Sequence, residues 1–250
     1  MKLDFNGKVA VVTGADGVIG ATICKTFVEN GAKVVAAGEN EDAVKELAQA
    51  LGSASIPATV DTGDMASVTA MIEGAVKAFG RIDMLVNATF VENKAEDHKP
   101  MQDYDDDLWT AVINKQLNGV FYASRSAAAQ MVAQGTGGSI VNVTSAMGVI
   151  PVKMQCAFVA ASAGTPNFTK AMALELGPEH IRVNCVAVGA IEGADYIEGM
   201  VSHAAEKKVG KAEDVAAMVA LLSDENASGT VTGSVITVDG GFTAGFARDF

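Results

Sequence analysis

A chain of 250 residues with 49% hydrophobic and 19% charged residues is too apolar for a disordered protein and has the length of one large domain. Thirty acidic residues against eighteen basic ones give a net charge of −12, which argues against binding to nucleic acid or to anionic lipid. The sequence has no apolar run of the roughly 18–20 residues that a membrane helix needs.

The cysteines, histidines and first residues bear on compartment and metal binding. Cys24, Cys156 and Cys185 are odd in number and scattered, as is typical of small buried hydrophobes in a reducing compartment. Residues 1–8 lack the apolar core of a signal peptide, so we expect a cytoplasmic protein. The three histidines stand far apart and have no zinc spacing, so we expect no metal site.

Short runs rich in Val and Ala alternate along the chain with longer stretches of helical spacing. Strands are predicted at residues 8–13, 33–37, 56–60, 82–86, 140–144, 181–188 and 234–238. Helices are predicted at residues 20–29, 41–51, 66–79, 108–134, 166–176 (extending back towards Phe158) and 213–222. Continuous apolar strands are buried on both faces, so the pattern predicts one doubly wound α/β domain with a parallel sheet over residues 1–250. The charged stretch 90–102 is predicted to be a surface loop.

A glycine-rich turn at residues 13–20 (TGADGVIG) follows the first predicted strand and opens the first helix. In a Rossmann domain this turn holds the pyrophosphate of a dinucleotide on backbone N–H groups. Glycine also ends strands where no ligand binds, so this segment alone leaves both interpretations open.

The rest of the chain resembles the short-chain dehydrogenase/reductase family from end to end. The matching stretches are residues 7–14 (GKVAVVTG), 80–87 (GRIDMLVN), 138–145 (GSIVNVTS), 181–184 (IRVN) and 238–241 (VDGG). This resemblance implies a single Rossmann domain with a seven-stranded parallel sheet flanked by helices, an NAD(P) cofactor and usually a tetramer.

Several positions depart from what the resemblance implies for the cofactor. Val18 stands at the middle glycine of the family's turn, and Phe90 stands at a glycine that follows the fourth strand. Gly38 takes the place of the acidic residue that holds the adenine ribose, although Glu39 is adjacent. We therefore expect this chain to bind no cofactor, and we treat seven positions as vestigial: Gly14, Val18, Gly20, Gly38, Asp61, Asn87 and Phe90.

The catalytic positions implied by the resemblance are altered too. The family uses an Asn-Ser-Tyr-Lys set, of which Ser145 matches. The Tyr position is Phe158 and the Lys position is Ser162, while the Asn position is Gln116, with Asn114 two places early. Loss of a general acid/base alone costs about 10²–10⁴-fold in rate. The four positions are therefore treated as vestigial, and no catalytic residue is assigned.

This degenerate pattern resembles the inactive subunits of heterotetrameric short-chain alcohol dehydrogenases. The resemblance implies a non-catalytic subunit that assembles with an active homologue carrying NAD, in an alcohol or hydroxyacyl-CoA dehydrogenase. The expected contact helices are residues 104–134 and 158–177, together with the C-terminal stretch 241–250. Residues 189–210, which form the lid in the family, are shorter than usual, which agrees with a cleft that closes on nothing.

Two other hypotheses stay open. The chain could be a binding or sensor protein that keeps a ligand in the altered cleft, or an enzyme whose catalytic groups have moved, with Ser145 and Tyr196 as candidates. Lys153, like Tyr196, is expected in a loop near the mouth of the cleft, whereas Tyr122 is expected to pack inside a helix. The acidic run 103–107 is expected to be a solvated helix start, because carboxylates favour the positive end of a helix dipole.

Overall fold

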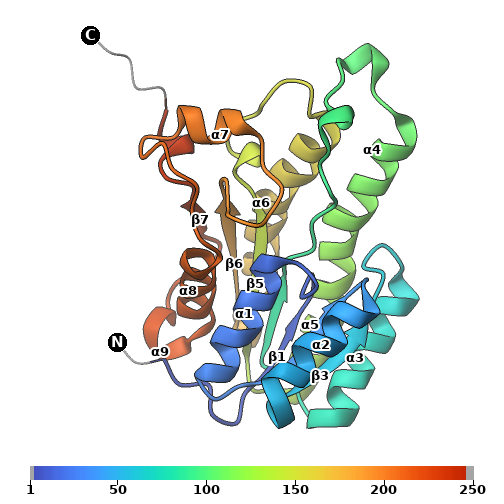
Figure 1. Ribbon diagram of the computed structural model, residues 1–250. Helices are drawn as coiled ribbons and strands as arrows, with labels where there is room; N and C mark the ends of the chain where they lie inside the picture. Colours follow the sequence, from blue (N-terminus) through green and yellow to red (C-terminus); the bar gives the residue numbers. More distant parts are fainter. Residues whose placement is uncertain (1–2, 246–250) are drawn as a thin grey trace.

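Seven parallel strands lie side by side in the order β3-β2-β1-β4-β5-β6-β7 in the computed structural model, which describes residues 3–245 (Figure 1). The strands are β1 (Val9–Val12), β2 (Lys33–Gly38), β3 (Ser55–Thr59), β4 (Met84–Asn87), β5 (Gly138–Ser145), β6 (Ile181–Val188) and β7 (Val235–Val238). Each predicted strand is present within a few residues of its expected bounds. The predicted doubly wound parallel fold is confirmed.

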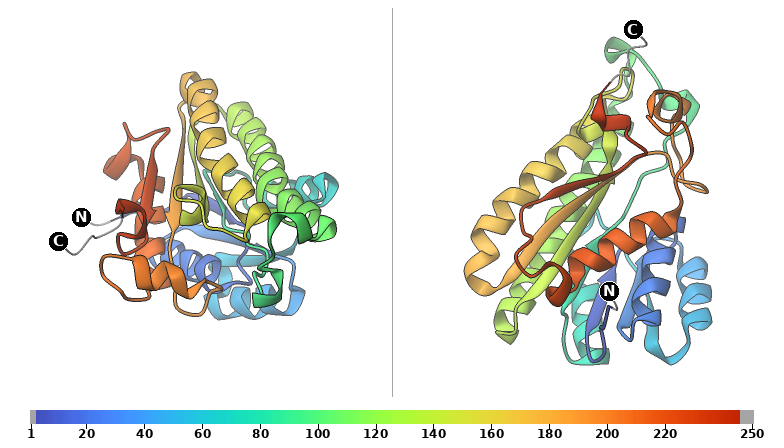
Figure 2. Two further views of the ribbon diagram at one scale, coloured as in Figure 1. Left: turned by 90° about the horizontal axis from the view of Figure 1, so that it is seen from above. Right: turned by 90° about the vertical axis from the view of Figure 1, so that its left-hand side faces the viewer.

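Helices cover both faces of this sheet, as the two views of Figure 2 show. The helices are α1 (Val18–Glu29), α2 (Glu41–Leu51), α3 (Met65–Phe79), α4 (Asp106–Ile113), α5 (Gly119–Gln134), α6 (Cys156–Leu176), α7 (Glu198–His203), α8 (Ala212–Ser223) and α9 (Glu225–Ser228). One π-helical turn, Asn114–Asn118, joins α4 to α5. The predicted helix 108–134 is therefore continuous in direction but begins two residues earlier.

A side-chain cap marks the beginning of α4, and a contact from β5 lies at the proline of α6. The Asp105 carboxylate accepts hydrogen bonds from the N–H groups of Asp107 and Leu108, which hold the pKa of Asp105 below its usual range and cap α4. Pro166 lies inside α6, so the carbonyl four residues earlier, on Ser162, receives no helical N–H. The Thr144 hydroxyl donates a long hydrogen bond of 3.5 Å to that carbonyl.

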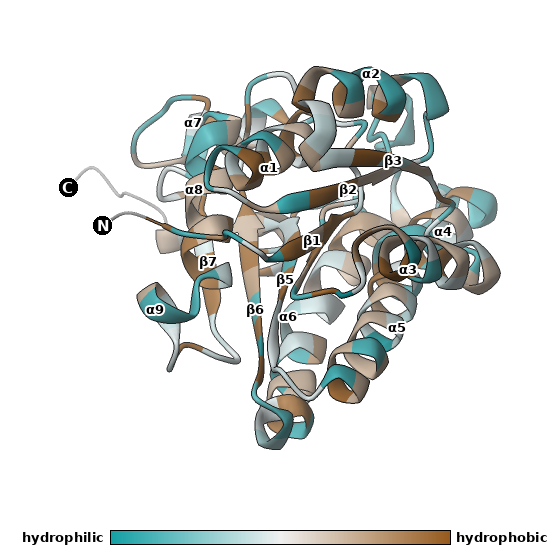
Figure 3. Ribbon diagram, turned by 90° about the horizontal axis from the view of Figure 1, so that it is seen from below, coloured by the Kyte–Doolittle hydropathy of each residue, from teal (hydrophilic) through white to brown (hydrophobic). Residues whose placement is uncertain are grey.

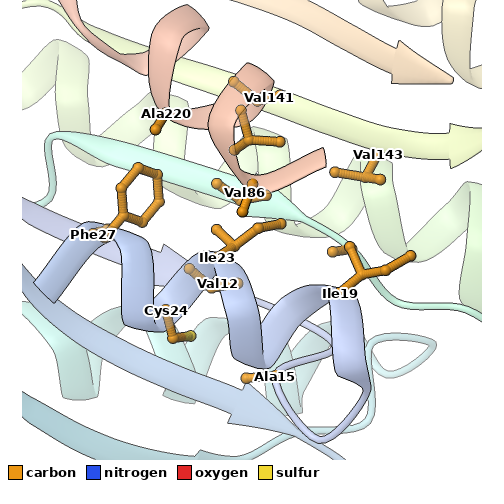
Figure 4. Packing of buried hydrophobic residues seen from close by; sticks show 14 of the residues in the cluster. Val12, Ala15, Ile19, Ile23, Cys24, Phe27, Val86, Val141, Val143 and Ala220 are labelled. Atoms are coloured by element: carbon orange, nitrogen blue, oxygen red, sulfur yellow. The ribbon is translucent and has the colours of Figure 1, made fainter. Parts of the chain in front are cut away.

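Alternate residues of the central strands feed two separate cores. Ala10 and Val12 of β1 pack with α1, α2 and α8 on one face, where Phe27 and Ile23 are fully buried (Figure 4). Val11 packs on the other face with α3, α5 and α6. Figure 3 shows the resulting hydrophobic strands between helices whose outward residues are hydrophilic. The sheet is thus buried on both sides, as continuous apolar strands require.

The stretches that resemble the dehydrogenase family contain buried polar residues that hydrogen-bond neighbouring elements of the fold. Asp83 is buried and accepts hydrogen bonds of 2.9 Å from Val9 N–H and Arg81 Nε. Arg182, also buried, donates to the Leu222 carbonyl at 2.6 Å, and Asn184 bonds both Val231 and Ser234. Retention of these motifs is therefore explained by the fold, whatever the chemistry of the cleft.

Within residues 3–245, no three His, Cys, Asp or Glu side chains gather as a metal site, and none of the helices is both long and apolar enough to cross a membrane. The C-terminal residues 246–250, part of the expected contact stretch, lie outside the described part of the chain.

Thiol reactivity gives a direct test of this packing. Burial raises the pKa of the Cys24 thiol and raises that of Cys185 to about 12, whereas Cys156 is only half-buried. Because the thiolate is the reactive form, we expect one of the three thiols to react quickly with Ellman's reagent at pH 8 in the native protein. All three should react after unfolding in guanidinium chloride, and Cys156→Ser should abolish the fast phase. A fast phase that survives Cys156→Ser would contradict the described core.

Candidate functional site

A cavity of about 440 Å³ lies at the carboxyl ends of the strands, where the strand order reverses between β1 and β4. Such a switch point is where open α/β sheets bind ligands. The walls come from the segments that follow β1, β2, β4, β5 and β6, and from α6 and the π-helical turn. The predicted vestigial positions therefore converge on one cavity, with two exceptions described below.

The two matching glycines of the turn are required by close backbone packing. Gly14 has a positive φ of 67°, and a Cβ there would lie 2.2 Å from the Ala88 carbonyl oxygen. A Cβ on Gly20 would lie 2.1 Å from the Gly14 carbonyl oxygen. Both contacts are impossible for any other residue. These glycines seat α1 against the ends of β1 and β4 and carry no information about a cofactor.

Val18 and Phe90 both line the cavity without filling it. Val18 is the first residue of α1 and is 36% exposed, and its side chain comes within 3.6 Å of where a Cβ on Gly193 would lie. Phe90, after β4, is 40% exposed. The glycine turn and the segment after β6 thus approach each other at Val18, while an open cavity remains beside them.

The end of β2 carries a feature that the sequence comparison missed. The Asp16 carboxylate lies against Gly38, where a Cβ would come within 2.5 Å of it, and accepts hydrogen bonds of 2.9 Å from the N–H groups of Glu39 and Asn40. An acid in the glycine turn therefore takes the space of an acidic side chain at position 38. The signal in the sequence is the presence of an acid at Asp16 together with a glycine at position 38.

An ion pair crosses the mouth of the cavity near this carboxylate. Lys115 Nζ, on the π-helical turn, lies 2.7 Å from Glu39 Oε2 after β2. Lys115 is the only lysine or arginine among the described residues of the cavity wall, and this pair neutralises it. No local sequence pattern indicates this contact, because its partners are 76 residues apart.

The four vestigial catalytic positions all line the cavity. Phe158 of α6 is buried in an apolar cluster that includes Val112 and Met147, and Ser162 lies one turn later. Ser145 accepts a hydrogen bond from Met147 N–H at 3.2 Å, which is the local cap expected of a hydroxyl at a strand end. Gln116 lines the cavity from the π-helical turn. These four side chains supply hydroxyl and amide groups, and none of the four is titratable.

Three retained polar positions act outside the cavity wall. Asp61 accepts from Gly63 N–H at 2.9 Å in a local turn, and Asn114 donates to the Gly63 carbonyl. Asn87 is buried behind the cavity and donates to Ser124 and Asn142. The structure therefore places Asp61 and Asn87 in supporting contacts, apart from the other vestigial cofactor positions.

The segment 189–210 forms a wall of the cavity, although a shortened lid is expected to cover nothing. Ile191 pairs with Gly210, and Met200 of α7 is buried facing the cavity. The Asp195 carboxylate accepts a 3.3 Å hydrogen bond from Asn93 N–H, which joins this segment to the loop after β4.

The candidates for relocated chemistry occupy different places. Tyr196 lines the cavity and is 39% exposed. Tyr122 packs on the core formed with α3 and α5, beside Phe121, as expected. Lys153 is absent from the described cavity wall. Only Tyr196 and Ser145 therefore remain as candidates placed at the cavity.

The structural role of the glycine turn is tested by one substitution at two positions. Gly20→Ala is expected to lower the free energy of unfolding by about 3 kcal/mol, because the Cβ meets backbone that cannot move away. The matched change Gly74→Ala, in the exposed middle of α3 with nothing within 4 Å, should raise it by about 0.5–1 kcal/mol. Urea denaturation measures both. Equal effects at the two sites would show that the turn is loosely packed.

Comparisons with known proteins agree with this geometry. A family model described as short chain dehydrogenase matches residues 8–203. The chain is 32% identical over 246 residues to 3-oxoacyl-(acyl-carrier-protein) reductase of Salmonella typhimurium, covering 96% of this chain and 98% of that protein. It is 35% identical over 251 residues to cis-4-hydroxycyclohexanecarboxylate dehydrogenase of Sinomonas cyclohexanicum, with 96% and 98% covered.

Solved structures show the same likeness. A putative short-chain alcohol dehydrogenase from Sinorhizobium meliloti superposes with a TM-score of 0.90 at 26% identity, covering 98% of this chain and 100% of that one. A short-chain type dehydrogenase/reductase from Mycobacterium marinum superposes with a TM-score of 0.87 at 30% identity, covering 97% of each chain. On the strength of its sequence, its sheet and its cavity, the chain belongs to the short-chain dehydrogenase/reductase family.

Proposed function

We propose that this chain is a non-catalytic subunit that assembles with an active member of its family to form an NAD-dependent alcohol or hydroxyacyl-CoA dehydrogenase. The observation that carries the proposal is the wall of α6, where Phe158 and Ser162 stand at the positions of the family's catalytic Tyr and Lys. A phenyl ring has no proton to exchange, and a serine hydroxyl supplies no positive charge to lower a neighbour's pKa.

We infer that this cavity does not take a nicotinamide dinucleotide, and three features of its wall support the inference. The Asp16 carboxylate fills the space against Gly38 and already accepts the N–H groups that end β2. The Glu39–Lys115 pair closes the adjacent mouth, and the cavity's one lysine is neutralised within it. A pyrophosphate at the glycine turn would lie beside Val18 and near the Asp16 carboxylate, which has no cationic partner among the described residues. We infer that NAD belongs to the partner subunit and that this chain binds none.

The helices α4, α5 and α6 are the surface on which we expect the partner to bind. They carry large apolar side chains that are at least 40% exposed, namely Trp109, Phe121, Val132 and Leu174. Small residues such as Ala127 and Ala128 on α5 permit close approach of a neighbouring helix. A heterotetramer built on these helices would leave the partner's own cleft free.

As the substrate of the complex we propose 2-(hydroxy(phenyl)methyl)succinyl-CoA, an intermediate of anaerobic toluene degradation. The chain resembles the inactive subunit of the dehydrogenase that acts on this compound. The degenerate pattern of positions supports this choice. The relatives named above act, by their names, on an acyl-carrier-protein thioester and on a cyclic hydroxy acid, which are related substrate classes.

One observation favours a second candidate function, a ligand-binding or sensor protein. The cavity keeps a volume of about 440 Å³, which lies within the range of small-molecule sites. An oxidoreductase with relocated groups is the third candidate, since Tyr196 and Ser145 both line this cavity.

Purification from the native host tests the proposal. This chain should co-purify in stoichiometric amounts with a homologue that carries an intact Tyr-x-x-x-Lys pair, and the partner expressed alone should lose solubility or activity. The isolated chain should show turnover at least about 10²-fold below the complex, because it lacks a general acid/base. It should also leave NADH fluorescence unchanged.

Variants separate the alternatives. Phe158→Leu, which keeps the buried position apolar, should leave the rate constant of the complex unchanged, whereas replacing the partner's catalytic tyrosine should abolish activity. If the pure isolated chain shows turnover, and Tyr196→Phe or Ser145→Ala lowers that turnover, the result would instead support relocated catalytic groups. A fully soluble and active partner in the absence of this chain would sink the subunit proposal.

A further inference from the structure

Four carboxylates line the cavity, those of Asp16, Glu39, Glu92 and Asp195. Two of them have a cationic side chain beside them: Glu39 pairs with Lys115 at 2.7 Å, and Glu92 pairs with Lys94 at 3.1 Å. In the described part of the chain, Asp16 and Asp195 form no ion pair and instead accept main-chain N–H groups. Two negative charges in the wall are therefore uncompensated.

The segments that carry these two charges approach each other. Val18 lies two residues after Asp16, Gly193 lies two residues before Asp195, and the Val18 side chain reaches to 3.6 Å from the Cβ position of Gly193. A carboxylate offers about four acceptor positions, so the two N–H donors on Asp16 and the one on Asp195 leave acceptor capacity unused. Both acids are thereby held by the backbone while remaining able to accept from a ligand.

Aromatic and aliphatic side chains supply the rest of the wall. Phe90 and Tyr196 flank the cavity with 40% and 39% of their surface exposed, and aromatic faces attract cations. Met147, Met200 and Phe158 are buried on the inner side. The cavity thus offers an apolar interior next to aromatic rings and two fixed negative charges.

We propose that this cavity binds a small organic cation, with an apolar ring against the inner wall and a protonated amine at the rim, which carries the negative charges of Asp16 and Asp195. The inference rests on the proposed function in one respect, namely that no dinucleotide takes the cavity. It reverses the charge preference of a nucleotide site, because the wall repels phosphates and carboxylates and attracts ammonium groups. Binding involves no chemical conversion of the ligand.

Three probes with one ring system separate charge from hydrophobicity. They are 2-naphthylmethylamine, 2-naphthylmethanol and 2-naphthoate, which carry one positive charge, no charge and one negative charge at neutral pH. Titration of the purified full-length chain by calorimetry should give the amine an affinity about tenfold above the alcohol, with the carboxylate weakest. Raising the salt concentration to about 0.5 M should reduce the difference in affinity between the amine and the alcohol, because salt screens exposed charges.

Charge-neutral variants locate the effect. Asp195→Asn should lower the affinity for the amine about two- to fivefold and leave the affinity for the alcohol unchanged. Asp16→Asn is expected to act in the same direction. The matched control is Glu46→Gln on the exposed face of α2, which removes the same charge from the chain outside the cavity and should change neither affinity. An equal loss in the control would assign the preference to the overall charge of the chain and overturn the site.

The other outcomes are equally decisive. Equal affinity for amine and alcohol, tighter binding of 2-naphthoate, or no binding of any probe overturns the proposal. These failures leave the subunit proposal standing as long as the chain co-purifies with an active homologue and lacks its own turnover. NADH binding and turnover by the isolated chain would refute the subunit proposal and would remove the premise of the cation site as well.

Discussion

The contact on which the rest of the structure depends is the meeting of backbone with backbone at the glycine turn. Gly14 lies directly on the Ala88 carbonyl and Gly20 lies on the Gly14 carbonyl, at distances that admit no side chain. These contacts fix α1 across the ends of β1 and β4 and so create the opening between the two halves of the sheet. In this chain they serve the packing of α1 against the sheet, independently of any chemistry in the cavity.

This separation of folding from chemistry explains the mixed character of the sequence. The stretches that match the family contain Asp83, Arg182 and Asn184, each of which satisfies buried backbone groups between elements. The positions that depart from it, such as Phe158 and Gly38, face the cavity or its rim. The residues that hold the fold together therefore match the family, while residues that face the cavity depart from it. This pattern is expected if, as proposed above, catalysis resides in a partner subunit.

The fold was predictable from the sequence because short, continuous apolar runs alternate with longer stretches of helical spacing. The helix that contains Pro166 shows the limit of that reasoning: proline argues for a helix start, yet Thr144 supplies a partner for the carbonyl that the proline frees, and the helix begins at Cys156. Thr144 lies on β5 and not on the helix, so no sequence pattern within the helix indicates this contact.

The candidate site was predictable in its position and much less so in its charge. Alignment to the family located Val18, Phe90 and Phe158, and all three line the cavity. The Asp16 contact joins residues more than twenty positions apart, and the Lys115–Glu39 pair joins residues 76 apart. Such contacts depend on how loops meet after folding, which composition and spacing do not specify.

The fit of Asp16 against Gly38 also has a consequence for redesign of the chain. A side chain restored at position 38 alone would collide with the Asp16 carboxylate at 2.5 Å, while loss of Asp16 alone would strip two N–H groups of their acceptor. Positions 16 and 38 are therefore coupled, since a side chain added at one collides with the carboxylate of the other. An acidic side chain can be engineered at position 38 only if Asp16 is replaced by a smaller residue in the same variant.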